Sequence, residues 1–261
     1  MGPGPERKVA VRTWDAVVGP VGSLAVHIAP DAPVPPGSAN TAVLCHDFPV
    51  ESQSAHQTGR SLPVLADRLA AESGWRVVAG CLRGVGSSDG EFSLSGWLED
   101  LRVLVDHAAD LAAGGGVWVV GFGVSGSLAL CLAAKDDRIR GVACLAAPAT
   151  FTDWALDPVA MLAAARRVGV VKLDSDVTLE AWANQFVELD PVEAAHQVTP
   201  RPILVIHGAD DAEVPMADAR ALAEAAGSSA ELRLLPGAGH RLRADPRAMA
   251  LLVGWLERQG P

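Results

Sequence analysis

The sequence lacks the features that would point to a nucleic acid or a membrane as its partner. It has no excess of positive charge, because 21 Lys and Arg residues stand against 31 Asp and Glu residues and the formal net charge is −10. A field of that sign repels a phosphate backbone. No stretch reaches the ~18 uninterrupted apolar residues of a membrane span, and the opening MGPGPERKVAV has no apolar core of a secretion signal. We therefore expect a cytoplasmic protein that binds neither nucleic acid nor a membrane.

Cysteine is scarce as well. Cys45, Cys81, Cys131 and Cys144 each fall inside an expected strand or helix, with no CxxC pair and no Cys/His spacing of a metal site. We interpret them as reduced core residues and expect no metal and no cofactor. Tyrosine is absent, but beside frequent Ala, Arg and Gly this reflects composition and excludes no chemistry.

What is present is a regular alternation of strand-like and helix-like segments, apart from the Pro/Gly-rich stretches 1–7 and 31–40. Strands are expected at 9–14, 24–29, 41–46, 76–81, 117–122, 141–147, 203–208 and 231–237. Helices are expected at 62–73, 95–113, 124–135, 217–226 and 246–259. Runs such as VWVV and ILVI are typical of a parallel sheet covered by helices on both faces. The first two strands have no helix between them, which predicts an antiparallel pair at one edge.

Residues 150–200 interrupt the alternation, since DPVAMLAAARRVGV and TLEAWANQFVEL are both helical where one crossover helix would suffice. An insertion here would lie above the carboxyl ends of the strands, where open α/β sheets bind ligands. We expect either a small lid within a single domain spanning 1–261 or an ordinary pair of packing helices. In either case Trp154, Trp182 and Phe186 line an apolar pocket or pack the helices together.

The segment VWVVGFGVSG runs from a strand directly into a helix at residues 117–126. Such a turn forces its apex into positive φ and requires small residues two places on either side. These are the properties of a nucleophile elbow, usually Gly-x-Ser-x-Gly, but the residue at the apex is Gly123.

Two later segments add an acid and a histidine. HGADDAEVP (207–215) follows a strong strand and has an acid three residues after a Gly, and LPGAGH (235–240) follows the last strand and ends in a histidine. The chain order is thus elbow, acid, histidine, which is the order of the α/β-hydrolases.

With these three segments the chain resembles the α/β-hydrolase superfamily, and small bacterial serine hydrolases in particular, over roughly residues 9–258. LCHDFPV (44–50) is similar to the family's His-Gly loop after the third strand, and RGVGSSDG (83–90) is similar to its Arg-Gly-x-Gly-x-Ser loop after the fourth. The resemblance implies an α/β fold with an eight-stranded, mostly parallel sheet flanked by helices and a short helical lid.

The resemblance also implies roles for particular residues. His240 would be the general base and Asp211 the acid that orients it, with Asp210 as the alternative acid. The backbone N–H groups of Phe48 and Val124 would form the oxyanion hole.

The chain departs from the family pattern twice. Gly123 has no side chain to form a covalent intermediate, and it adopts positive φ without the strain that another residue would pay. Asp47 stands where the family usually has Gly, and a carboxylate turned inward would oppose a developing oxyanion. The sequence does not fix the direction of that side chain.

Ser125 is the alternative nucleophile, because GVSGS (123–127) nearly satisfies the same motif when the frame slides by two residues. In the unshifted frame Ser125 lies in the first helical turn, about 200° around the axis from the apex, and is a small packing residue. His46 and His207 at strand ends are expected to be structural, and Ser87, Ser88 and Asp89 to form a tight turn.

Three hypotheses for function remain open. The first is an enzyme on a small-molecule ester or related acyl compound, in which His240 activates a water at the apex or abstracts a substrate proton. The second is a pseudo-hydrolase that binds a ligand or a partner without chemistry. In the third, Gly123 is a single substitution in an ordinary serine hydrolase.

Overall fold

One mixed sheet organises the chain in the computed structural model, which describes residues 14–30, 40–51, 54–112 and 115–260. Its strands are β1 (Asp15–Gly19), β2 (Gly22–Ile28), β3 (Thr41–Cys45), β4 (Arg76–Gly80), β5 (Val117–Phe122), β6 (Ile139–Leu145), β7 (Ile203–Gly208) and β8 (Ala230–Leu235). They are ordered β1-β2-β4-β3-β5-β6-β7-β8. The strands from β4 to β8 are parallel, and β1 and β2 are antiparallel to their neighbours.

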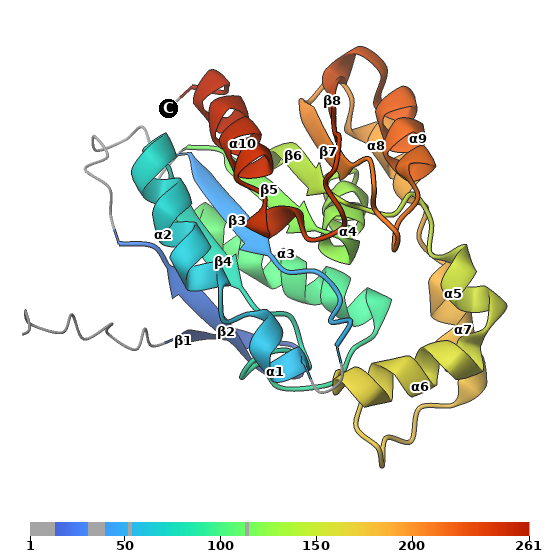
Figure 1. Cartoon of the computed structure of the whole chain (residues 1–261). Coiled ribbons are helices and arrows are strands. Elements are labelled where there is room, and N and C mark those ends of the chain that lie inside the picture. The colour runs from blue at the N-terminus through green and yellow to red at the C-terminus, as the bar shows by residue number, and fades with distance from the viewer. Residues whose placement is uncertain (1–13, 31–39, 52–53, 113–114, 261) are drawn as a thin grey trace, which may run out of the picture.

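Helices cover both faces of this sheet (Figure 1). The helices are α1 (Ala55–Thr58), α2 (Leu62–Ser73), α3 (Leu94–Leu111), α4 (Val124–Ala133), α5 (Thr152–Leu156), α6 (Pro158–Val168), α7 (Leu179–Asn184), α8 (Pro191–Val198), α9 (Met216–Ala226) and α10 (Pro246–Arg258). One apolar core joins the sheet to α3, α4, α8 and α9, and a second joins it to α2 and α10. Central strands such as β5 are therefore buried on both faces, which explains their uninterrupted apolar sequence.

The antiparallel edge lies later in the sequence than predicted. The expected first strand at 9–14 is wrong in its described part: residues 9–13 lie outside the described residues, Trp14 is not in a strand, and β1 begins at Asp15. The alternating run DAVVG pairs with β2 through the tight turn between Gly19 and Gly22. The predicted antiparallel pairing itself is confirmed. The remaining predicted strands and helices match the observed ones to within two residues where the structure describes them.

The predicted helical insertion corresponds to α5, α6, α7 and a 3₁₀ turn at Gln185–Val187, which extend away from the sheet in Figure 1. The last helix of the segment, α8, belongs instead to the sheet's own covering layer, where it packs against α4 and α9. None of the described helices is long and apolar enough to cross a membrane.

Candidate active site

The elbow forms at Gly123 in the unshifted frame. Strand β5 ends at Phe122, helix α4 begins at Val124, and Gly123 between them has φ 51° and ψ −124°. On the strand side, a Cβ at Gly121 would overlap the backbone of Ser125 and Gly126, so the close approach of strand and helix requires glycine there.

The space next to the apex is filled by the carboxylate of Asp47, from the loop after β3. A Cβ built on Gly123 would lie 1.7–2.3 Å from the three carboxylate atoms of Asp47. Contacts of a real Cβ atom are essentially never shorter than 3.0 Å. This corrects the expectation that a water would take the place of the missing side chain. It also links the two departures from the family pattern, because Asp47 can point inward only if residue 123 has no side chain.

One carboxylate oxygen of Asp47 occupies the predicted oxyanion hole. The backbone N–H of Phe48 donates to Oδ1 at 2.6 Å, and the N–H of Val124 donates to the same oxygen at 2.9 Å. Two amides that converge on a single oxygen are the arrangement that stabilises an oxyanion. The two predicted donors are thus brought together, and their common acceptor belongs to the protein itself.

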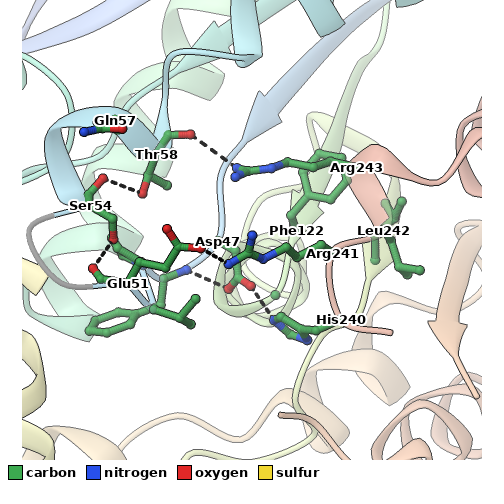
Figure 2. A pocket seen from close by; sticks show the side chains of 15 residues that line it. Asp47, Glu51, Ser54, Gln57, Thr58, Phe122, His240, Arg241, Leu242 and Arg243 are labelled. Atoms are coloured by element: carbon green, nitrogen blue, oxygen red, sulfur yellow. Dashed lines mark hydrogen bonds and ion pairs between the residues drawn. The ribbon is translucent and has the colours of Figure 1, made fainter. Parts of the chain in front are cut away.

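The second carboxylate oxygen faces His240, as Figure 2 shows, and the ring of His240 lies between this carboxylate and that of Asp211. Nε2 is 2.6 Å from Asp47 Oδ2, and Nδ1 is 2.8 Å from Asp211 Oδ2. A third carboxylate, that of Glu213, lies 3.8 Å from Nε2. Ionised carboxylates only accept hydrogen bonds, so the ring satisfies both close partners only when both of its nitrogens are protonated.

The electrostatics agree with that geometry. Burial by itself would lower the pKa of His240, but the hydrogen bonds and charges of Asp211 and Asp47 outweigh it and raise the pKa to about 10. Burial would raise the pKa of Asp211, but hydrogen bonds from His240 and from the amides of Val214 and Glu213 leave it below its usual value. At neutral pH the cluster is therefore an imidazolium between two carboxylates.

The loop that carries Asp47 is anchored by buried polar groups. His46 Nδ1–H donates to the Asp47 carbonyl at 2.8 Å, and the Leu82 amide donates to His46 Nε2 at 3.0 Å, which fixes a neutral ring. Burial accordingly lowers the pKa of His46 to about 4. The hydroxyl of Ser125 donates to the His46 carbonyl at 2.5 Å. These contacts hold the backbone from which Asp47 projects.

Ser125 therefore does not occupy the position that the shifted frame requires. Its hydroxyl is fully buried against the loop after β3 and is not among the partners of His240, so the geometry does not support the alternative with Ser125 as nucleophile. The physical reason is helical geometry, since Ser125 follows the apex by two residues and faces the sheet. Asp210, the alternative acid, is exposed, and its amide donates to Ala238.

Other predicted residues have structural contacts. His207 is buried, and its Nε2–H donates to the Val214 carbonyl at 3.0 Å. Ser88 and Asp89 bind the backbone of β2, through the amides of Ala25 and Ser23 respectively. All four cysteines are free and buried. Among the described residues no group of three or more His, Cys, Asp and Glu side chains is arranged to hold a metal ion.

Two cavities meet at Asp47 and His240. The apolar one has a volume of about 360 Å³ and lies under α5 and α6. Its apolar lining consists of Phe48, Pro49, Val50, Val124, Pro148, Phe151, Trp154, Met161, Ala164, Val168, Val214 and Pro215. Of the three aromatic residues predicted for this region, Trp154 lines the cavity. Trp182 and Phe186 do not: they are buried, with Phe186 5.5 Å from Trp154 between ring centroids.

The polar cavity, of about 220 Å³, is also lined by Asp47 and His240 and is drawn in Figure 2. Besides Asp47, its polar lining consists of Glu51, Ser54, Gln57, Thr58, His240, Arg241 and Arg243. Arg241 forms an ion pair with Glu51, and Arg243 Nη1 donates to the Thr58 carbonyl at 3.2 Å. Arg243 could not be predicted from the sequence, because a lone arginine three residues after the histidine belongs to no motif.

The chain matches no protein-family profile and no curated protein sequence, but it is similar to many solved structures. Est1E from Butyrivibrio proteoclasticus, which has also been solved with ferulic acid, is 16% identical with a TM-score of 0.69, covering 95% of this chain and 97% of its own. A meta-cleavage product hydrolase from Pseudomonas fluorescens is 17% identical with a TM-score of 0.64, covering 95% and 99%. An α/β serine hydrolase homologue from Coxiella burnetii is 19% identical with a TM-score of 0.60, covering 97% and 99%.

These similarities show that the chain has the α/β-hydrolase fold, as the sequence predicts. At identities of this size they show the fold alone. What the site does must therefore be argued from the residues of this chain.

Proposed function

We propose that the protein is a hydrolase of small organic molecules in which the carboxylate of Asp47, rather than an elbow serine, is the nucleophile. The observation that carries the proposal is the position of that carboxylate, with Oδ1 bound by the Phe48 and Val124 amides and Oδ2 2.6 Å from His240. Carboxylates serve as covalent nucleophiles in other enzymes. His240 and Asp211 keep the roles that the resemblance implies.

The proposed substrate has a leaving group on a saturated carbon. Oδ2 of Asp47 attacks that carbon, a C–O bond forms, and the bond to the leaving group breaks, which gives an ester of Asp47. A water, deprotonated by His240 Nε2, then attacks the Cγ of Asp47. The negative charge develops on Oδ1, where the two amides already point. Collapse breaks the new C–O bond, so the sum is R–X plus water to R–OH plus HX.

The charge on His240 changes at the right step. In the resting site both neighbouring carboxylates hold its proton, so it is no base at neutral pH. Esterification removes the charge of Asp47 and with it one of the causes of the raised pKa. His240 then gives up its proton and can accept one from water, while Asp211 continues to orient the ring through Nδ1.

The geometry argues against direct hydrolysis of an ordinary ester. An ester carbonyl needs the two amides that Asp47 Oδ1 already occupies, and a water at the apex needs the space that the same carboxylate fills. The hypothesis of a single substitution in a serine hydrolase does not explain why an aspartate stands at position 47. Gly123 and Asp47 instead form a sterically matched pair, because the carboxylate fills the space beside the glycine.

The test is to look for the covalent intermediate. Purified protein is incubated with primary bromoalkanes and ω-phenyl bromoalkanes, and bromide release is measured. The His240→Gln variant should accumulate an adduct on the Asp47 peptide by mass spectrometry, because alkylation no longer leads to hydrolysis. Burial raises the pKa of the cysteine thiols, so they stay protonated and compete little.

Asp210→Asn is the matched control, since Asp210 is an exposed carboxylate adjacent to Asp211. In water enriched in ¹⁸O the unaltered protein should incorporate the label into Asp47 over several turnovers, and Asp47→Asn should neither release bromide nor form an adduct. Bromide release that survives Asp47→Asn would contradict the proposal.

The second candidate is a pseudo-hydrolase that binds a small ligand. The observation that favours it is the closed charge network itself, in which the oxyanion amides and both nitrogens of His240 are already satisfied by Asp47 and Asp211. If this candidate is correct, apolar ligands bind in the 360 Å³ cavity, and neither labelling of Asp47 nor turnover is found with any electrophile.

A further inference from the structure

Arg243 is a half-buried cation with few partners. Its Nη1 donates to the backbone carbonyl of Thr58 at 3.2 Å, and within the described residues it forms no ion pair. It lines the 220 Å³ cavity together with Asp47 and His240. A guanidinium carries five N–H donors in a planar fork, so a single carbonyl leaves most of its capacity unused.

The other charges that line this cavity are paired. Asp47 is bound to His240, and Glu51 is bound to Arg241. Arg243 is the remaining charged side chain among the lining residues. Unpaired charge is costly away from water unless something compensates it, and a planar guanidinium matches a carboxylate in a bidentate fashion. The surplus positive charge is notable in a chain of net charge −10.

We infer that Arg243 is an anion-binding residue and that the substrate carries a carboxylate. The apolar part of the substrate would lie in the apolar cavity of 360 Å³. The inference rests on the proposed function for the identity of the reacting group, Asp47. Asp47 lines both cavities, so a molecule with an apolar end and a carboxylate end would cross it at the carbon between them. The carboxylate would then fix which carbon faces Oδ2.

The test uses binding of unreactive ligands, so its outcome does not depend on catalysis. Phenylacetate and its uncharged counterpart phenylacetamide are titrated against the purified protein by calorimetry at pH 7. We expect phenylacetate to bind about 10-fold or more tightly than the amide, which is typical of one charge-assisted hydrogen-bonded pair. Arg243→Gln should abolish this preference, and Arg243→Lys should retain part of it.

Arg241→Gln is the matched control, because it removes the same charge from a neighbouring arginine that already has a partner in Glu51. It should change the preference by less than about 3-fold, as expected for an exposed pair. Equal binding of the two ligands by the unaltered protein, or an unchanged preference in Arg243→Gln, would overturn the inference. The ligand comparison and Arg243→Lys decide the matter even if Arg243→Gln does not fold.

The two proposals fail separately. If phenylacetate is preferred and bromide release is not observed, the result supports Arg243 as an anion-binding residue and contradicts the role of Asp47 as nucleophile. If bromoalkanes turn over and the preference is absent, the reverse holds. Bromoacids should be better substrates than bromoalkanes of the same length only if both are correct.

Discussion

Two clusters that join carboxylates to a cation lie at the carboxyl ends of neighbouring strands, and they differ in what surrounds them. After β4, Arg83 binds two carboxylates: Asp100 is fully buried, with both of its oxygens on the guanidinium at 2.8–3.1 Å, and the half-exposed Glu99 accepts from Nη2 at 3.1 Å. After β3, Asp47 pairs with His240, but both side chains line the cavities and Asp47 keeps 21% of its side-chain exposure.

The cations differ as well. A guanidinium does not lose its proton in a protein, whereas an imidazole does. The Arg83 cluster can therefore only hold the loop after β4 in place, and removal of Asp100 leaves the buried guanidinium with the half-exposed Glu99 as its only ionic partner among the described residues. The His240 pair can change its protonation when a neighbouring charge disappears. The same pairing of opposite charges thus gives a structural cross-link where the cation cannot titrate, and a group whose charge can change where the cation is an imidazole.

The comparison is tested most strongly by removing one carboxylate from each cluster. Asp47→Asn should reduce turnover by more than about 1000-fold, since an amide is no nucleophile, and should lower the free energy of unfolding by about 1–2 kcal/mol, because His240 loses one of its two carboxylate partners. Asp100→Asn should instead destabilise the protein by about 3–5 kcal/mol, the usual cost of breaking a buried pair. Urea denaturation and bromide release measure the two effects. A strongly destabilised Asp47→Asn variant would erase the distinction.

The orienting carboxylate gives the next largest effect. Asp211→Asn should slow hydrolysis of the Asp47 ester by about 10³- to 10⁴-fold, as loss of the third member does in other triads, while leaving alkylation much less affected. The ester should therefore build up, which a time course of intact mass would detect. The turnover rate of the Asp210→Asn variant should lie within a factor of about two of that of the unaltered protein. Similar losses in both variants would mean that Asp211 has no special role.

The matched pair of Gly123 and Asp47 can be exchanged for a serine site. Gly123→Ser with Asp47→Gly should gain hydrolysis of 4-nitrophenyl acetate and labelling by a fluorophosphonate, because the amides and His240 become free. Gly123→Ser alone should gain little, since its Cβ would overlap the carboxylate. If the single variant were as active as the double one, Asp47 would not be held where the structure has it.

Stability should depend on pH through His240 and not through Arg83. The folded-state pKa of His240 is raised from 6.5 to about 10, so its contribution to stability is complete below pH 6.5 and is lost as the pH rises toward 10. We expect Tm to fall by about 5–10 °C over that interval, since 1 kcal/mol corresponds to about 2–4 °C in a chain of this size. His240→Gln should lack this fall. A fall of the same size in that variant would assign it to other groups.

The smallest effect concerns Ser125. Ser125→Ala removes one buried hydrogen bond to the His46 carbonyl and should cost about 1 kcal/mol of stability. Turnover should fall by less than about 5-fold, because the hydroxyl positions a loop and touches no reacting atom. Loss of fluorophosphonate labelling or of all turnover in the Ser125→Ala variant would support the hypothesis that Ser125 is the nucleophile.

The fold could be predicted because its signals are local and redundant. Doubly buried strands such as VWVVGF, the small residues around Gly123 and the chain order of Asp211 and His240 each constrain the same topology. The edge strand was misplaced because β1 is a short, half-exposed run whose pairing depends on the turn between Gly19 and Gly22, and the preceding VAVRTW has stronger strand propensity.

The site was less accessible to prediction. Asp47 was recognised as a departure, but the rotamer that turns it toward Gly123 depends on three segments meeting in space. The signal that could have identified it was the coincidence of a missing side chain at the apex with an extra one in the facing loop. Arg243 offered no signal, since its lack of an ionic partner is a property of the folded neighbourhood.

The steric match between residues 47 and 123 also bears on how such a site could arise. A chain with serine at the apex has no space for the aspartate, and a chain with glycine at both positions has neither the serine nor the aspartate. If the two positions change one at a time, the intermediate protein therefore has either a steric overlap between residues 47 and 123 or no side chain that could act as the nucleophile. Under the proposed function, the two kinds of site share one fold, yet they are separated by a step that selection for activity would not favour.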